Sequence, residues 1–428
     1  MIKNYDKKPK RLWIFFLPVI FILLGLVSCM SSPVKNGDAD MEIRMSSMPL
    51  SAPSSLQSDG ISQLVDANSS FALELLGNIF DREANLVFSP HSLSTVLAMP
   101  FAGARGQTET QMAGALHFTL SQEKLHQAFN ALNQNLSGYQ FAQLTVSNAV
   151  WGSPDTPYQE PFLDILAEFY GTGVRLVDFS DSRGAVQQIN RWVSDQTLER
   201  IPELLAPDAI KNETDLVLTN AVYFKAAWAE PFSGDATRDG IFNLLDGGKV
   251  IVPMMSRLIQ AKYSEDLWGT AIEIPYEGLE LSMVILLPKS DSFDSLIADF
   301  NGTRLNQILE QTAPKSVRLT LPKFQLESKV QVKESLMKMG MVDPFGNADF
   351  SGIDGTHELF IDDIYHQAFI NVAEAGTEAA AASAVVMSRK GIPQSDVELV
   401  VDHPFIFLIR DNTTGAILFL GYIVDPSI

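Results

Sequence analysis

The residues best suited to take part in chemistry are a basic pair, Arg389 and Lys390, near the end of the chain. They stand in the run Ser-Arg-Lys-Gly-Ile-Pro, which is polar and rich in turn-forming residues. Exposed polar segments of this kind are preferred sites of proteolytic cleavage. The chemistry indicated is cleavage of the chain's own backbone after Lys390 or Arg389; the alternative is a basic pair that stands by chance on a solvated loop.

The sequence offers no motif for catalysis of its own. It contains no G-x-S-x-G, no G-x-x-x-x-G-K-[ST], no G-x-G-x-x-G and no H-E-x-x-H. Its histidines are scattered, and no two have the spacing of metal ligands. We therefore predict that the protein is not an enzyme and needs neither metal nor cofactor. We expect structural roles for the six histidines: His91, His117, His126, His357, His366 and His403.

The segment that precedes the basic pair can be interpreted in two ways. Thr377 as a cap, Glu378 in a first turn and the alanines that follow would suit the start of a helix. However, the pattern has no apolar stripe to face a core, and it passes at once into Val-Val-Met at 385–387, which favours a strand. The second interpretation is a segment that can enter a β-sheet as a new central strand.

Two properties support entry into a sheet. Every residue of a central strand must donate to the hydrogen-bond ladder, and no proline occurs between Glu374 and Gly391; the first is Pro393. With a period of two, one face holds only small or β-branched side chains, while Glu378 falls on the other face, where it can reach solvent. The small face consists of Thr377, Ala379, Ala381, Ser383 and Val385.

Residues 1–28 have the pattern of a signal peptide for export. Basic residues at 3–11 precede an apolar run at 12–27, which is short for a membrane span of about 20 residues. The run ends in Leu-Val-Ser-Cys, which resembles a bacterial lipobox, and Cys29 is the only cysteine of the chain. We predict that Cys29 carries a lipid. The alternative is an uncleaved signal anchor in which Cys29 stands by chance.

The charge of the chain narrows the choice of partners. Five basic residues and one acidic residue give the leader a net charge of +4, which leaves −24 for the rest of a chain whose total is −20. This argues against nucleic acid, anionic lipid surfaces and heparin-like polymers as partners. We expect an exported protein, either lipid-anchored at the cell envelope (periplasmic or at the cell surface) or secreted, whose membrane contact is the lipid alone.

The rest of the chain divides into a tether and one domain. Residues 29–60 are rich in Ser, Pro and Met without apolar periodicity, which predicts a flexible tether. Residues 61–428 are globular in pattern, without an internal repeat, and predict one large domain. Helices gather early and strands late, which predicts an α+β architecture. Helical spacing occurs at 64–80, 92–102, 122–136, 161–169, 182–197 and 331–339. Strand patterns occur at 144–151, 215–224, 279–287, 317–324, 404–409 and 416–422.

Several motifs in this order resemble the serpin family over about 360 residues. The segment similar to the hinge of inhibitory members comprises Glu374, Ala375, Gly376, Thr377, Glu378, Ala379, Ala380, Ala381, Ala382 and Ser383; only Ala375 departs from the common pattern. Further matches lie at 85–92, 190–193, 218–228, 348–353, 366–372, 403–409 and 419–421. The resemblance implies a serpin-like α+β fold, in which several helices pack on a large mixed main sheet with smaller sheets and an exposed reactive loop at about 374–403.

The resemblance also implies a mechanism. A serine protease cleaves the loop and forms an acyl-enzyme, and the chain from about Thr377 inserts as a sixth strand into a five-stranded sheet, so that the protease is trapped in a covalent complex. Counting sixteen positions from Glu374 places the reactive bond at Lys390–Gly391, with Arg389 as the alternative and a range up to 393. Ser89, Asn220 and His366 would form a polar shutter under the sheet. A trypsin-like target and a monomeric inhibitor are expected.

Three alternatives remain open at this point. A non-inhibitory serpin would serve as a binding or carrier module with the same fold, although its hinge would be expected to contain bulky, charged or proline residues. A cross-class inhibitor would act on cysteine proteases. An unrelated lipoprotein enzyme would need a nucleophile or metal motif that the sequence lacks.

Overall fold

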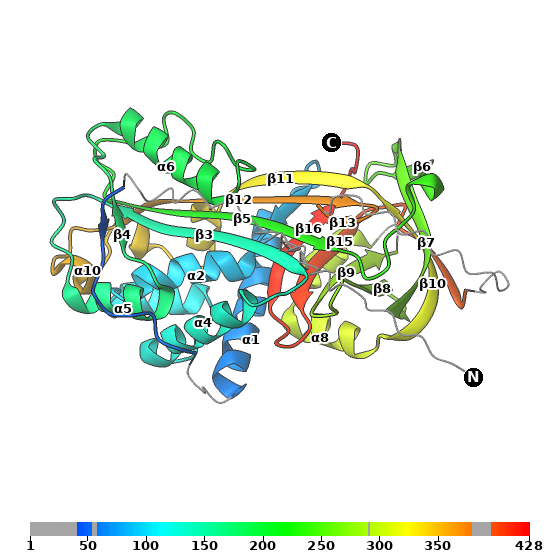
Figure 1. Cartoon of the computed structure of the whole chain (residues 1–428), viewed down its shortest axis with the longest axis horizontal. Helices are drawn as coiled ribbons and strands as arrows, with labels where there is room; N and C mark the ends of the chain where they lie inside the picture. The colour runs from blue at the N-terminus through cyan, green and yellow to red at the C-terminus, as the bar shows by residue number, and fades with distance from the viewer. Residues whose placement is uncertain (1–40, 54–57, 290–291, 379–394) are drawn as a thin grey trace, which may run out of the picture. The chain divides into compact units, whose positions relative to one another are not determined.

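The computed structural model describes residues 41–53, 58–289, 292–378 and 395–428 (Figure 1). The leader with Cys29, the hinge residues 379–383 and the predicted reactive bond at 389–391 lie outside the described residues. The predictions made for them stay predictions.

The longer helices come from the first half of the chain. Apolar side chains of α1, such as Phe71 and Leu75, are fully buried, as their helical spacing predicts. Helix α2 starts at Pro90, and the side chain of Ser89 caps it by accepting from the backbone N–H of Ser92. The helices are α1 (Ser58–Ile79), α2 (Pro90–Phe101), α3 (Gly106–Ala115), α4 (Gln122–Leu136), α5 (Glu160–Tyr170), α6 (Ser182–Gln196), α7 (Phe293–Asp299), α8 (Gly302–Glu310), α9 (Lys333–Lys338) and α10 (Ser351–Asp354).

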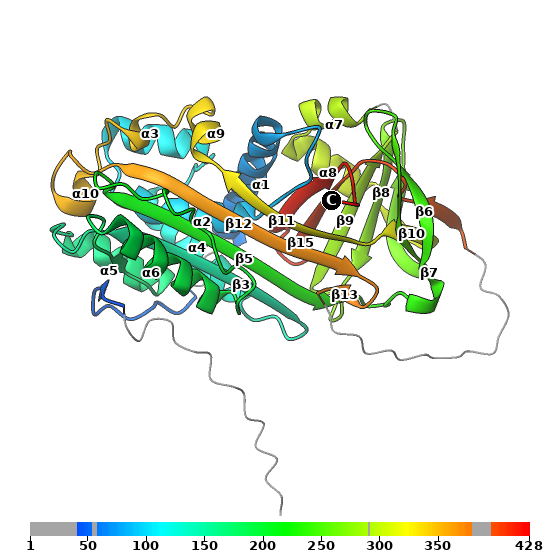
Figure 2. The same ribbon diagram turned by 90° about the horizontal axis from the view of Figure 1, so that it is seen from above.

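The main sheet is mixed and runs in the order β1-β4-β3-β5-β13-β12-β11. Strand β5 is antiparallel to β3 and parallel to β12, and β12 is antiparallel to β11. Figure 2 shows these long strands side by side. The strands are β1 (Ile43–Arg44), β3 (Ala142–Gly152), β4 (Val174–Leu176), β5 (Leu216–Ala227), β11 (Phe324–Gln331), β12 (Ile361–Ala373) and β13 (Gly376–Thr377).

The second sheet runs in the order β14-β10-β7-β8-β9-β15-β16-β2, and β6 pairs with β7 off this path. Its central strands β9, β15 and β16 are buried along their whole length apart from Arg410, so both of their faces are covered. The strands are β2 (Leu86–Phe88), β6 (Arg238–Asn243), β7 (Lys249–Glu265), β8 (Gly269–Pro275), β9 (Leu281–Pro288), β10 (Ala313–Pro322), β14 (Val397–Val400), β15 (Phe405–Asp411) and β16 (Ile417–Ile423).

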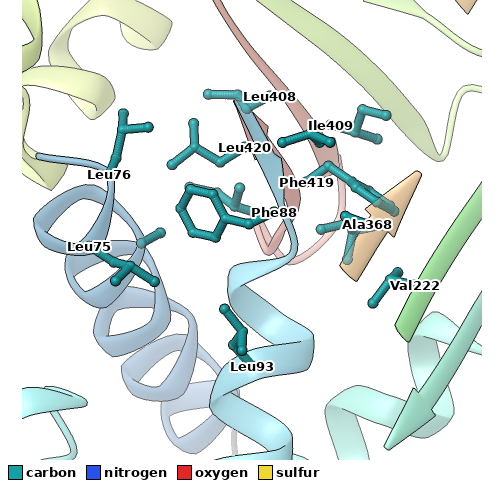
Figure 3. Packing of buried hydrophobic residues seen from close by; sticks show 14 of the residues in the cluster. Leu75, Leu76, Phe88, Leu93, Val222, Ala368, Leu408, Ile409, Phe419 and Leu420 are labelled. Atoms are coloured by element: carbon teal, nitrogen blue, oxygen red, sulfur yellow. The ribbon is translucent and has the colours of Figure 1, made fainter. Parts of the chain in front are cut away.

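One hydrophobic core joins the two sheets and the helices packed between them. Figure 3 shows Phe88 of β2 between Leu75 of α1 and Leu420 of β16, with Val222 of β5 and Ala368 of β12 at the edge of the same cluster. All five side chains are at most 1% exposed. Because β2 leads directly into α2, a single stretch of chain connects the second sheet with the helix beneath the main sheet.

Helix α6 covers the opposite face of the main sheet (Figure 1). It contributes Ile189, Trp192 and Val193 to a smaller core cluster that includes Trp151 of β3 and Val217 of β5. Trp192 meets Trp151 edge to face at a centroid distance of 5.4 Å. Trp192 is thus a packing residue.

The predicted α+β architecture is confirmed, and most predicted elements lie within a few residues of the observed ones. The stretch predicted as a tether at 29–60 differs from the structure where it is described. Ile43 and Arg44 pair with β4, Ser46 Oγ donates to Asp164 of α5, and α1 begins at Ser58. Backbone pairing of two residues leaves no periodic signal in a sequence, which is why composition alone indicated a flexible segment.

Candidate functional site

The first residues of the predicted hinge lie inside the main sheet. Gly376 and Thr377 form β13, which pairs with Ala226 and Ala227 of β5 on one side and with Val372 and Ala373 of β12 on the other. We call the position between β5 and β12 the slot. The sequence predicted five strands with the loop outside; instead, two residues of the hinge already occupy the mouth of the slot, with β1 added at the far edge.

Beyond the mouth, the slot is closed by direct pairing of its two walls. Residues 361–369 of β12 pair in parallel with residues 216–223 of β5. Strand β13, by contrast, runs antiparallel to both neighbours. Extending β13 would therefore replace one parallel pairing by two antiparallel pairings, which are slightly more stable per residue.

The mouth of the slot accepts only a narrow set of side chains. Gly376 has a φ of +150°, and a Cβ there would lie 2.1 Å from the carbonyl oxygen of Ala226, so the site requires glycine. Thr377 is fully buried, and its hydroxyl lies 2.7 Å from the hydroxyl of Tyr276. Burial raises the pKa of Tyr276 far above 10, so the phenol stays protonated and can donate to or accept from Thr377.

A group of hydrogen bonds fixes the chain just before the slot. The carboxylate of Glu374 accepts from Lys323 Nζ at 2.9 Å and from Thr237 Oγ1 at 2.8 Å. Partial burial acts against ionisation, but these bonds outweigh it and hold the pKa of Glu374 below its usual value. Trp228 donates from its backbone to Ala375 and from its ring to Ala373, and it stacks on Tyr276 at 4.6 Å. Trp228 is therefore a packing residue that also positions the hinge.

The structure contradicts the expectation that the side chain of Glu378 reaches solvent. Its side chain is only 10% exposed and forms an ion pair of 2.6 Å with Arg200, from the segment that follows α6. Its backbone N–H donates to Asn371 at 2.8 Å, with a φ of +48°. Burial and the neighbouring Glu378 carboxylate raise the pKa of Tyr223, which lies under Arg200, to about 12. The outward face of the slot is covered because the chain after α6 crosses it.

Farther along the slot, His366 connects both of its walls with helix α2. Nε2 of His366 accepts from the backbone N–H of Ser89 at 3.1 Å, and Nδ1 lies 2.5 Å from Oδ1 of Asn220. An amide oxygen can only accept, so Nδ1 carries the single proton of a neutral ring. Burial lowers the pKa of His366 to about 3, which agrees with that tautomer. A protonated ring would set an N–H donor against the N–H of Ser89.

Asn220 extends this cluster to a third strand. Its amide nitrogen donates to Ser92 Oγ of α2 and to Asn148 Oδ1 of β3, and all these groups are buried or nearly so. Parting the walls of the slot must break the bond between His366 and Asn220. The three residues predicted as a shutter thus meet, with Ser89 contributing its backbone N–H to His366 while its side chain caps α2.

The model of the protein family described as "Serpin (serine protease inhibitor)" matches residues 66–426. The chain belongs to the serpin family. Leukocyte elastase inhibitor of Homo sapiens is 37% identical over 380 residues, covering 85% of this chain and all of the relative. An uncharacterized serpin-like protein of Thermococcus kodakarensis is 38% identical over 371 residues, covering 85% of this chain and 86% of the relative.

Solved structures agree with the family. Tengpin, a thermophilic serpin in the native state, matches with a TM-score of 0.81 and 28% identity over 90% of this chain and 99% of that chain. Human thyroxine-binding globulin complexed with thyroxine matches with a TM-score of 0.78 and 29% identity over 86% and 99%. The predicted serpin fold, with helices packed on large mixed sheets, is confirmed.

Two shutter contacts of this serpin were missed at the level of sequence. Ser92 lies in a motif that was noted, but its contact with Asn220 was not expected, and Asn148 was not noted at all. Asn148 stands directly opposite Asn220 in the pairing of β3 with β5. A register between strands that are 72 residues apart cannot be read from one sequence, so no local signal pointed to Asn148.

The far end of the predicted loop of this serpin is partly ordered as a strand. Residues 397–400, inside the predicted span of 374–403, form β14, which pairs in parallel with β10. Asn243 of β6 binds the carbonyl oxygen of Asp402 through its backbone N–H at 2.7 Å and through its side chain at 3.1 Å. The described chain is therefore fixed to the fold on both sides of residues 379–394.

The histidines outside the slot have protein partners. His91 and His126 are buried, and burial lowers the pKa of each to about 4. His117, His357 and His403 lie within salt-bridge distance of Glu74, Asp349 and Asp402. Within the described ranges, no group of three or more acidic, histidine or cysteine side chains could hold a metal ion. No helix among the described residues is long and apolar enough to cross a membrane.

Proposed function

We propose that this serpin is a suicide inhibitor of serine proteases, and that its targets are trypsin-like. The observation that carries the proposal is β13, because the start of the hinge already lies antiparallel between β5 and β12. The small residues that continue the same face, Ala379, Ala381 and Ser383, suit a strand that enters a tight slot. The likeness to leukocyte elastase inhibitors supports protease inhibition in general.

The proposed reaction begins as ordinary proteolysis. The serine of the protease attacks the carbonyl carbon of Lys390, or of Arg389, and forms an ester, while the new amino group of the following residue leaves. Cleavage releases the hinge from its distal attachment, and β13 can then lengthen along the slot. About a dozen ladder hydrogen bonds at about 1 kcal/mol net each would favour insertion by roughly 10 kcal/mol.

Insertion would inactivate the protease before water releases it. The acyl-enzyme is carried along with the inserting strand, and a displacement of about 1 Å in a catalytic site can slow a reaction about a hundredfold. The ester therefore persists as a covalent complex. The trypsin-like preference follows from the cations of Arg389 and Lys390, which suit an acidic specificity pocket; cysteine proteases with a similar preference are a second class of target.

The leader and the charge support an extracytoplasmic site of action. We propose that residues 1–28 direct export, that Cys29 carries the lipid, and that the inhibitor acts as a monomer at the cell envelope or outside the cell. The acidic chain would bind its target protease through the bait segment, by which we mean the reactive loop around Lys390. A polyanion would not assist binding, because like charges repel.

A carrier function is the second candidate, and one cavity favours it. A groove of about 800 Å³ lies between α1, α8 and the strands β15 and β16, lined in part by Glu74, Asn306 and Arg410. Thyroxine-binding globulin, which has the same fold, is described as binding thyroxine. Against this candidate, the hinge at 374–383 has none of the bulky or proline residues expected of a serpin that does not insert its loop.

The decisive experiment is incubation of the exported form with trypsin, followed by denaturing electrophoresis and N-terminal sequencing of the released fragment. Inhibition predicts a band that holds both proteins and a fragment that starts at Gly391, or at Lys390 if Arg389 is used. Simple cleavage without a complex would contradict the inhibitor proposal and leave the carrier as the better candidate.

A further inference from the structure

The hairpin of β6 and β7 exposes apolar side chains that its own fold does not need. Phe242, Val252 and Met254 face the core and are at most 5% exposed. On the opposite face, Ile241 and Ile251 are directly paired and are 55% and 73% exposed. A strand pair over a core requires one apolar face and normally turns polar residues outward. At its centre, this hairpin is apolar on both faces.

The outward side of the hairpin forms a short strip. We call it the outer hairpin face, and it consists of Asp239, Ile241, Asn243, Lys249, Ile251 and Pro253. Its centre is apolar, with two isoleucines and Pro253 next to one another. One acidic and one basic residue at its margins leave it without net charge, on a chain that is strongly acidic overall.

Strand β6 lies close to the described chain on both sides of the bait segment. At the start of the strand, Thr237 donates to the side chain of Glu374, just before the slot. At its end, Asn243 donates to the carbonyl of Asp402, just after β14. The segment 237–243, which contains β6, thus touches the described chain on both sides of residues 379–394. Six residues of strand cover about 20 Å, so the outer hairpin face lies between the two attachments of the bait segment.

A protease that holds the bait segment would need more surface than that segment provides. Stable protein–protein contacts bury about 800 Å² on each partner, from 20 to 30 residues. The bait residues around Lys390 account for only part of such an area. The neighbouring surface must supply the remainder, and a strip with an apolar centre and no net charge is suited to it because the buried centre of an interface is depleted of charged residues and more apolar than its rim.

We propose that the outer hairpin face is a docking site for the target protease, contacted through an apolar surface beside the protease's active-site cleft. The inference rests on the proposed inhibitory function. It assigns Ile241 and Ile251 to the recognition of the protease and leaves insertion to the hinge. The slot does not include these residues, so the contact affects how fast a complex forms and not whether a bound protease is trapped.

The test is the double variant Ile241→Ser with Ile251→Ser, measured with trypsin, and Leu267→Ser as the control. Leu267 is 85% exposed in the turn between β7 and β8, so the control also removes an exposed apolar side chain. Partial burial of two isoleucines corresponds to about a tenfold effect. We expect complex formation to be about tenfold slower in the double variant, at 0.05 M and 0.5 M NaCl alike, with unchanged stoichiometry of inhibition and no change in the control.

Three outcomes would overturn the proposal. Equal rates for the double variant and the wild type would show that the face does not contact the protease. Sedimentation that finds a wild-type dimer and a monomeric double variant would assign the face to a second copy of the chain. Absence of a covalent complex with the wild type would remove the protease as partner, and would count against the proposed function itself. Circular dichroism and thermal unfolding of the variants exclude misfolding as the cause of a slower reaction.

Discussion

Substitution of Thr377 by arginine tests whether insertion at the slot is what traps the protease. Thr377 is fully buried between β5 and β12, and its hydroxyl bonds only to the buried hydroxyl of Tyr276 among the described residues. No acidic side chain pairs with it there. An arginine in this place would either be buried without a partner or keep the hinge out of the slot.

The magnitude follows from the cost of burying an unpaired charge, which is about 3–5 kcal/mol. Insertion proceeds from the mouth of the slot, so the cost falls on the first step and cannot be bypassed. At 1.4 kcal/mol for each factor of ten, an obstacle of about 4 kcal/mol slows insertion about a thousandfold. Hydrolysis of the acyl-enzyme then overtakes insertion, and the inhibitor becomes a substrate.

The assay is titration of trypsin with Thr377→Arg, together with denaturing electrophoresis and thermal unfolding of the cleaved product. We expect cleavage at the basic pair, almost no covalent complex and no gain in stability on cleavage. Thr377→Val is the matched control, because it keeps the volume and loses only the hydroxyl pair, at a cost of about 1–2 kcal/mol. If Thr377→Arg still trapped trypsin with the wild-type stoichiometry, the assignment of the slot as the trapping device would be wrong.

Three further substitutions or conditions separate the parts of the mechanism. Lys390→Glu should abolish inhibition of trypsin, because the acidic specificity pocket repels the new carboxylate; unchanged inhibition would move the reactive bond to Arg389. Arg200→Gln removes the ion pair of Glu378, so the docked hinge should loosen and the fluorescence emission of Trp228, which contacts the hinge, should shift. Arg191→Gln, on the exposed face of α6, should leave the emission spectrum unchanged. Identical spectra for the wild type and both variants would refute the role of this ion pair in holding the hinge. The pKa values of His91 and His126 are about 4 and that of His366 about 3, below the ordinary 6.5, so the fold favours their neutral forms and their contribution is complete above pH 6.5. Urea unfolding should therefore show stability falling as the pH drops from 6.5 toward 4, by up to about 1.4 kcal/mol per pH unit for each histidine, and a flat profile over that range would contradict their burial in the neutral form.

The sequence predicted elements well where a single period dominates a segment. Helix α4 was predicted at its observed bounds, 122–136, and strands β3 and β16 were predicted to within two residues at each end. The long strand β7 was missed because Pro253 interrupts its pattern and because it changes partner from β6 to β10 along its length. The apolar positions accordingly do not alternate regularly through the whole strand.

The sequence predicted which residues belong to the candidate site, but not that the first residues of the hinge already lie in the slot. Periodicity placed Thr377 on the inward face and Glu378 on the outward face, but it could not show that the chain after α6 lies over Glu378. Nor could it show that Gly376 and Thr377 are already paired, since their local propensity favours a helix start. The ion pair with Arg200 and the pairing with Ala226 and Ala227 of β5 join segments more than 100 residues apart. Such contacts leave no trace in a local pattern.

The fixed geometry around Gly376 has a consequence for engineering. The stretch from Glu374 to Glu378 is held by side chains from distant parts of the fold, each shaped to its neighbour, so exchange there would be expected to damage the scaffold. Under the two proposals above, the choice of protease is set elsewhere, by the residues around Lys390 and by the outer hairpin face. A design that seeks a new specificity should therefore change residues in those two places and leave the five residues from Glu374 to Glu378 unaltered.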